Sequence, residues 1–72
     1  MPNIEKLKDV IKEKGYTFSE IASAAGMNIS TLYRKINLSG DSFTIKEARL
    51  ISTFLKLTYD EVNEIFFNIS VA

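Results

Sequence analysis

The sequence has no cysteine and no histidine, and these two absences limit the chemistry open to the chain. Without cysteine no disulfide can cross-link the fold. Without either residue the usual ligands of zinc, haem and iron–sulfur clusters are missing. Nucleophiles activated by histidine are excluded too, and no side chain that ordinarily titrates near neutral pH remains as a general base. We therefore expect no enzymatic activity, no metal and no cofactor.

Long apolar stretches are also missing. No run approaches the ~20 residues that span a membrane, and the chain opens without the pattern of a signal peptide. The 72 residues are 46% apolar and 25% charged, the balance of a globular domain rather than of a disordered segment. A domain this short buries only ~60% of its unfolded surface, so it depends on close packing or on a partner. The sequence predicts one soluble intracellular domain over residues 1–72, without membrane contact.

An excess of basic charge is absent as well. Nine basic and nine acidic residues give a net charge of zero, whereas domains that bind nucleic acids are usually basic. The charges are nevertheless unevenly distributed. Residues 30–49 have four basic and two acidic side chains, and residues 50–72 have one basic and three acidic ones. The weak basic excess therefore lies in the middle of the chain.

Apolar residues recur every three or four positions along most of the chain, which is the spacing of amphipathic helices. Three Ser/Thr-x-x-Glu capping boxes begin at Thr17, Thr44 and Thr58. Asn3 can cap an earlier helix, and glycines follow the first two apolar stretches at positions 15 and 26. These signals predict an all-α fold, a compact five-helix bundle with helices over about 3–14, 17–25, 28–37, 45–55 and 59–67.

The segment TFSEIASAAGMNISTLYRKI, residues 17–36, resembles the helix-turn-helix of the phage repressor and Cro proteins, the Xre-like family. The matching positions are the small residue at the helix crossing, the turn glycine, the residue after the turn and the first inward residue of the second helix: Ala22, Gly26, Met27 and Leu32. Two helices that meet steeply over a short turn need a small contact residue and a permissive turn residue. The stretch STLYRKINLSGDSFTIKEA is also similar to small Cro-type regulators of phages that infect Gram-positive bacteria.

This resemblance implies a lambda-repressor-like DNA-binding domain with its helix-turn-helix at about residues 17–37. It implies a transcriptional regulator in a lysis/lysogeny type switch, located in the cytoplasm of the bacterial host cell, with double-stranded operator DNA as partner. In the family the recognition helix lies in the major groove. The positions carried over as DNA contacts are Asn28, Ile29, Ser30, Thr31, Tyr33, Arg34 and Asn37, with Lys35 and Lys46 placed for phosphates.

Helical spacing supports part of this assignment. Ser30, Arg34 and Asn37 fall on one stripe, with Leu32 and Ile36 on the other side of the same helix. Arg34 is the strongest candidate for base recognition, because its guanidinium matches the O6 and N7 acceptors of guanine.

Two apolar residues depart from the family pattern. Phe18 stands where the family often has a glutamine that touches phosphate, and Ile29 stands among the base-reading positions. An apolar face suits a protein partner, and it is also compatible with thymine methyl groups. The alternative function is therefore a modulator of repression, an antirepressor that binds the cognate phage repressor protein through its helix-turn-helix face.

The C-terminal residues contain more apolar side chains than one helix face can bury, namely Phe66, Phe67, Ile69 and Val71. Either this segment folds back over the core, or two copies meet there as a homodimer. A short edge strand from Asn68 to Val71 is a third interpretation. With Phe18 and Ile29, these four residues form the predicted protein interface.

Overall fold

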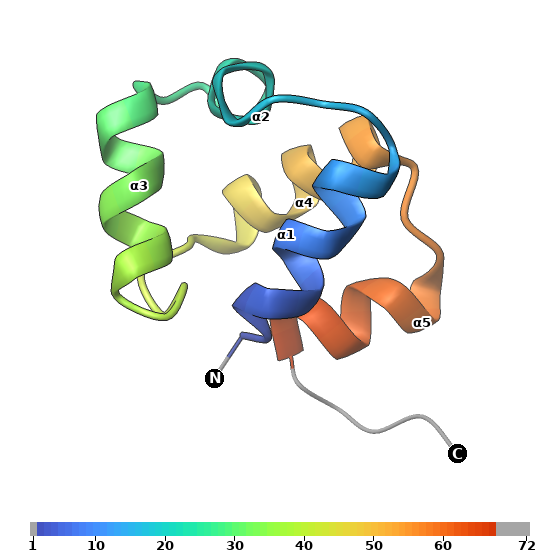
Figure 1. Ribbon diagram of the computed structural model, residues 1–72. Coiled ribbons are helices and arrows are strands. Elements are labelled where there is room, and N and C mark those ends of the chain that lie inside the picture. Colours follow the sequence, from blue (N-terminus) through green and yellow to red (C-terminus); the bar gives the residue numbers. More distant parts are fainter. Residues whose placement is uncertain (1, 68–72) are drawn as a thin grey trace.

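In the computed structural model, residues 2–67 are described, and they fold into five helices with no strand among them (Figure 1). The helices are α1 (Ile4–Glu13), α2 (Phe18–Ala24), α3 (Ile29–Asn37), α4 (Ile45–Leu55) and α5 (Tyr59–Val62), and α5 continues into a π-helical turn, η1 (Asn63–Phe67). The predicted compact all-α globule is confirmed. Within this described range, no helix is long and apolar enough to cross a membrane.

The predicted capping signals begin the helices as expected. The side chains of Thr17, Thr44 and Thr58 each accept a hydrogen bond from the amide three residues on, and the glutamate there accepts one from the threonine amide. Asn3 accepts from the Lys6 amide and caps α1. Each such cap contributes ~1 kcal/mol. Helix α3 differs, since Asn28 occupies its N-cap position without a capping hydrogen bond from its side chain.

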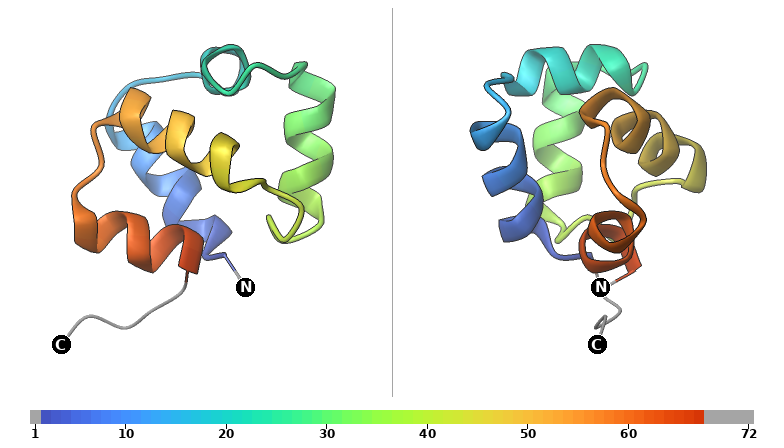
Figure 2. Two further views of the ribbon diagram at one scale, coloured as in Figure 1. Left: turned by 180° about the vertical axis from the view of Figure 1, so that it is seen from behind. Right: turned by 90° about the vertical axis from the view of Figure 1, so that its right-hand side faces the viewer.

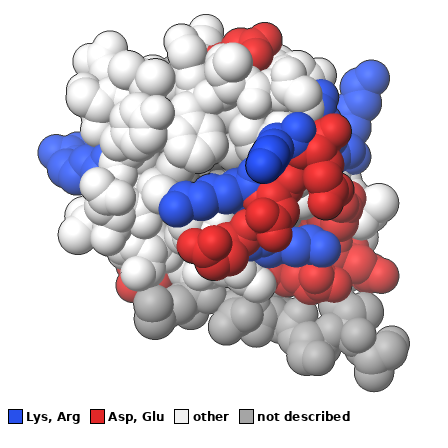
Figure 3. All heavy atoms as spheres, in the orientation of Figure 1, with Lys and Arg blue, Asp and Glu red and all other residues white. Residues whose placement is uncertain are grey.

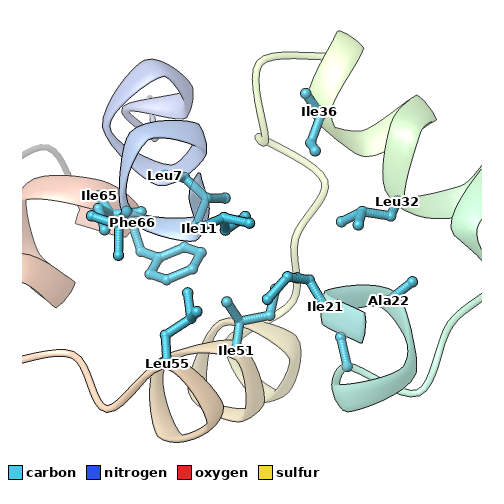
Figure 4. Close-up of a cluster of buried hydrophobic side chains, with 12 residues drawn as sticks. Leu7, Ile11, Ile21, Ala22, Leu32, Ile36, Ile51, Leu55, Ile65 and Phe66 are labelled. Atoms are coloured by element: carbon cyan, nitrogen blue, oxygen red, sulfur yellow. The ribbon is translucent and has the colours of Figure 1, made fainter. Parts of the chain in front are cut away.

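The helices share one hydrophobic core, to which α1, α2, α3, α4 and η1 all contribute side chains (Figure 4). Leu7, Ile21, Leu32, Ile51 and Ile65 are completely shielded from solvent. Leu32 is also the residue that the sequence analysis expects to point inward from the second helix of the helix-turn-helix. Ala48, Phe54 and Val62 are only partly buried and pack against the edge of this core.

The last helical segment is not the regular helix that the sequence predicts for residues 59–67. Its α-helical part ends at Val62, and the backbone then widens into the π-turn η1. The carbonyl of Ile65 accepts a hydrogen bond from the Asn3 amide at 2.6 Å, which ties this turn to the start of α1. The widened turn directs two consecutive side chains, Ile65 and Phe66, into the core and leaves Phe67 about half exposed.

Of the four C-terminal residues predicted for a protein interface, one is buried, one is exposed, and two lie outside the described residues. Phe66 is 8% exposed and packs its ring edge against Phe43, with ring centroids 6.1 Å apart, so it belongs to the core rather than to a surface interface. Phe67 is exposed beside Ile45 and lines an apolar hollow between α4 and η1. Ile69, Val71 and the suggested strand from Asn68 to Val71 lie outside the described residues.

Helix α3 stands at one edge of the molecule, where one side of it packs inward and the other faces solvent (Figures 1 and 2). A short turn through Gly26 joins it to α2, and its C-terminal end is joined to α4 by a loop over residues 38–44. In that loop Gly40 is buried in the left-handed conformation, with φ of 74°, against Pro2, Ile4 and Phe43. The loop thus anchors the lower end of α3 to the start of the chain.

Candidate nucleic-acid interface on helices α2 and α3

The outer side of α3 brings together most residues that the sequence analysis assigned to DNA. Its inner side buries Leu32 and Ile36, which fixes the rotation of the helix about its axis. The side chains left exposed on or beside the helix are Asn28, Ile29, Ser30, Tyr33, Arg34 and Asn37, and Thr31 is half-buried. The structure therefore places these predicted contacts on one continuous solvent-facing surface.

Two rows of different chemistry run along this surface. The polar row consists of Ser30, Arg34 and Asn37, spaced four and then three residues apart. The apolar row consists of Ile29 and Tyr33 on α3, together with Phe18 from the start of α2. The rings of Phe18 and Tyr33 pack in a tilted arrangement with centroids 5.4 Å apart, so the row joins the two helices. Phe18 is half-buried against the core, whereas Ile29 and Tyr33 are 43% and 46% exposed.

Lys35 does not belong to the outer surface of α3. Its side chain is only 12% exposed, and its ammonium donates to Glu47 Oε1 at 3.0 Å and to the Ser42 carbonyl at 2.8 Å. The ammonium also lies 6.0 Å from the centre of the Phe43 ring. This position corrects the assignment of Lys35 as a phosphate contact, because the side chain links α3 to the loop and to α4. No local sequence signal distinguishes Lys35 from an exposed lysine, since its partner Glu47 lies twelve residues away in the sequence.

Helix α3 and the turn before it contain no acidic side chain. Between Ile21 and Gly40 the sequence has no aspartate or glutamate, and the preceding Glu20 has its carboxylate engaged in the α2 capping box. Figure 3 shows the side of the molecule formed by α2 and α3 with few charged side chains, while charges of both signs gather over α1 and α5. Arg34 is exposed on this surface, and Lys46 is exposed in the first turn of α4. The acidic residues nearest to α3 in the sequence are Glu20 in α2 and Asp41 in the loop after α3, so α3 itself presents no carboxylate to a polyanion.

The carboxyl of Glu47 has a pKa below its ordinary value of 4.5. Partial burial alone would raise this pKa. The hydrogen bond from the Thr44 amide, followed by the hydrogen bond and charge of Lys35, outweighs burial and favours the ionised form. Since the folded chain binds this proton more weakly than the unfolded chain, the pair stabilises the fold above about pH 4.5, and this stabilisation is lost as the pH falls through the lower folded pKa.

Replacing Lys35 by methionine should lower the free energy of unfolding by about 1–2 kcal/mol at pH 7, because two charged hydrogen bonds are lost while the apolar stem is kept. The melting temperature should fall by about 5–15 °C. Lys46→Met is the matched control, since Lys46 is exposed and surface changes usually stay within about 0.5 kcal/mol. The difference between Lys35→Met and the unchanged chain should shrink below pH 4.5. Equal melting temperatures for both variants would contradict the structural role of Lys35.

Among residues 2–67, no group of three or more acidic side chains gathers into an arrangement that could hold a metal ion. Comparisons with protein-family models, with curated proteins and with solved structures return no match to this chain. The surface of α2 and α3 is therefore the feature that bears on function.

Proposed function

We propose that this chain binds double-stranded DNA through the outer side of α3 and acts as a transcriptional regulator. One observation carries the proposal: an exposed helix at the edge of the molecule presents a row of hydrogen-bonding side chains and has no acidic residue of its own. A single α-helix fits the major groove of B-DNA, where each base pair has its own pattern of donors and acceptors. The resemblance to phage repressor and Cro proteins supports a role in a lysis/lysogeny type switch.

Each residue of the polar row has a role in this proposal. The Arg34 guanidinium is suited to bidentate contact with the O6 and N7 atoms of guanine. Ser30 and Asn37 offer hydroxyl and carboxamide groups to neighbouring base edges. The Asn28 carboxamide is not used in capping α3, so it is free to bind a base edge or a phosphate at the start of the helix. Lys46 is assigned to a backbone phosphate.

Arg34→Ala should weaken binding to the preferred DNA site by ~1–3 kcal/mol and relax the sequence preference at one base pair. The measurement is a gel shift with a double-stranded oligonucleotide that the full chain selects from a random-sequence pool. Arg49→Ala is the matched control, because Arg49 lies on α4 beside the hollow that Phe67 lines. An equal loss on all sequences would reassign Arg34 to a phosphate. If the chain retained no DNA from the pool, the proposed function would be rejected.

A second candidate, a modulator that binds a cognate repressor protein, is favoured by the scarcity of cations on this surface. With Lys35 engaged by Glu47, Arg34 is the remaining basic side chain of α2 and α3, next to the apolar row. Adding the repressor to the gel shift separates the two candidates. A change in the repressor–DNA complex, without any complex of the chain alone, would favour the modulator.

A further inference from the structure

The apolar row of Phe18, Ile29 and Tyr33 lies beside the proposed base-reading row and is open to solvent on its outer side. Ile29 directly precedes Ser30, and Tyr33 directly precedes Arg34. Consecutive residues of an α-helix are about 100° apart around its axis, so each apolar side chain is a lateral neighbour of a polar one. A groove that receives the polar row would therefore bring its wall or floor against the apolar row as well.

The major groove has one apolar group that such a row can bind. Thymine presents its C5 methyl there, next to the O4 acceptor, and no other standard base has a methyl in the groove. When the exposed Ile29 contacts that methyl, apolar surface of both groups is removed from water, which favours binding. The partly exposed ring of Tyr33 adds apolar area one helical turn further on.

The size of the row argues against a protein partner as its main occupant. A stable protein interface buries about 800 Å² on each side. A fully buried aromatic side chain covers only about 150–250 Å², and both aromatic residues of this row are already partly covered by each other. Three partly exposed side chains are thus too small for such an interface and large enough for one or two methyl groups.

We infer that the apolar row reads thymine methyl groups, with Ile29 as the specificity-determining residue, so that the preferred DNA has a thymine beside the bases that the polar row contacts. This inference rests on the proposed function. It narrows the proposed ligand from any DNA duplex to a duplex with thymine at a defined position.

The test replaces each thymine of the selected oligonucleotide, one at a time, by deoxyuridine, which removes only the methyl group. At one or two positions the full chain should bind about three- to fivefold more weakly, because a buried methylene-sized group contributes ~0.8 kcal/mol. Ile29→Ser should bind the thymine duplex with a similar loss and should no longer distinguish thymine from deoxyuridine at one of these positions. Ile45→Ser is the matched control, because Ile45 is also the first residue of its helix and is 81% exposed beside Val62 and Phe67. It should keep the discrimination.

Thermal melting of both variants checks that neither substitution unfolds the chain. If every deoxyuridine duplex bound as well as its thymine parent while Arg34 still set a sequence preference, the inference would be wrong and the proposed function would stand. The row would then be available to a protein partner. If Ile29→Ser still distinguished the two bases as well as the unchanged chain, Ile29 would not be the reader. Failure to select any DNA would overturn both proposals together.

Discussion

Replacing Leu32 by alanine is expected to lower the free energy of unfolding by about 3–5 kcal/mol. Leu32 is completely shielded from solvent and reaches from α3 into the shared core (Figure 4). Its truncation leaves a cavity in addition to the lost apolar burial, and substitutions of this kind cost ~2–5 kcal/mol. A chain of 72 residues has a total stability of only about 4–11 kcal/mol. The loss is therefore a large share of the total stability, and the melting temperature should fall by at least about 12 °C.

Leu38→Ala is the control for this prediction, since it removes the same atoms from the end of the same helix. Leu38 is 57% exposed at the C-cap of α3, so its truncation should change stability by less than about 0.5 kcal/mol. The measurement is thermal and urea unfolding followed by circular dichroism at 222 nm. Similar midpoints for the two variants would show that α3 does not contribute to the core in the way described.

Gly40→Ala is expected to cost about 2–3 kcal/mol, for two independent reasons. The backbone at Gly40 has φ of 74°, a left-handed conformation that costs an alanine ~1 kcal/mol or more. A β-carbon there would lie 2.7 Å from Ile4 Cδ1 and 3.1 Å from the Pro2 β-carbon. Moving the Ile4 side chain aside relieves part of this overlap, and the rest adds overpacking that typically costs ~1–3 kcal/mol.

Gly15→Ala separates the two contributions, because Gly15 has a similar φ of 79° with no heavy atom within 4 Å of an added β-carbon. It should show the conformational cost alone, about 1–2 kcal/mol. The difference between the two variants in urea unfolding measures the close packing of the loop against the chain start. No difference between them would contradict the tight approach of Gly40 to Pro2 and Ile4.

The helices are the part of this fold that the sequence predicts best, because their signals are local. Thr44 and Glu47 lie three residues apart, and their capping box alone places the start of α4 at Ile45. Gly15 and Gly26 adopt the left-handed conformation expected where α1 and α2 end. The buried faces follow from apolar spacing in the same way, as with Leu32 and Ile36 on α3.

The features that sequence reasoning missed depend on residues far apart in the chain. The π-turn η1 is tied to α1 by the bond between the Asn3 amide and the Ile65 carbonyl, which a pattern within residues 59–67 cannot show. Lys35 has the residue type and position of a phosphate contact, and only the folded loop brings it to Glu47. The exposed outer row of α3 was predictable because Leu32 and Ile36 define the opposite side.

One oxygen of the Glu47 carboxylate accepts two structural hydrogen bonds, and this restricts which substitutions the chain can accept during evolution. Its Oε1 accepts from the Thr44 amide at 2.9 Å to begin α4 and from Lys35 at 3.0 Å to hold α3. Aspartate is one methylene too short to contact both the Thr44 amide and the Lys35 ammonium. Glutamine keeps an acceptor oxygen but loses the charge that attracts the ammonium. Positions 35 and 47 are therefore expected to change only together, whereas the exposed positions 30, 34 and 37 on α3 are free to diverge as the proposed DNA target changes.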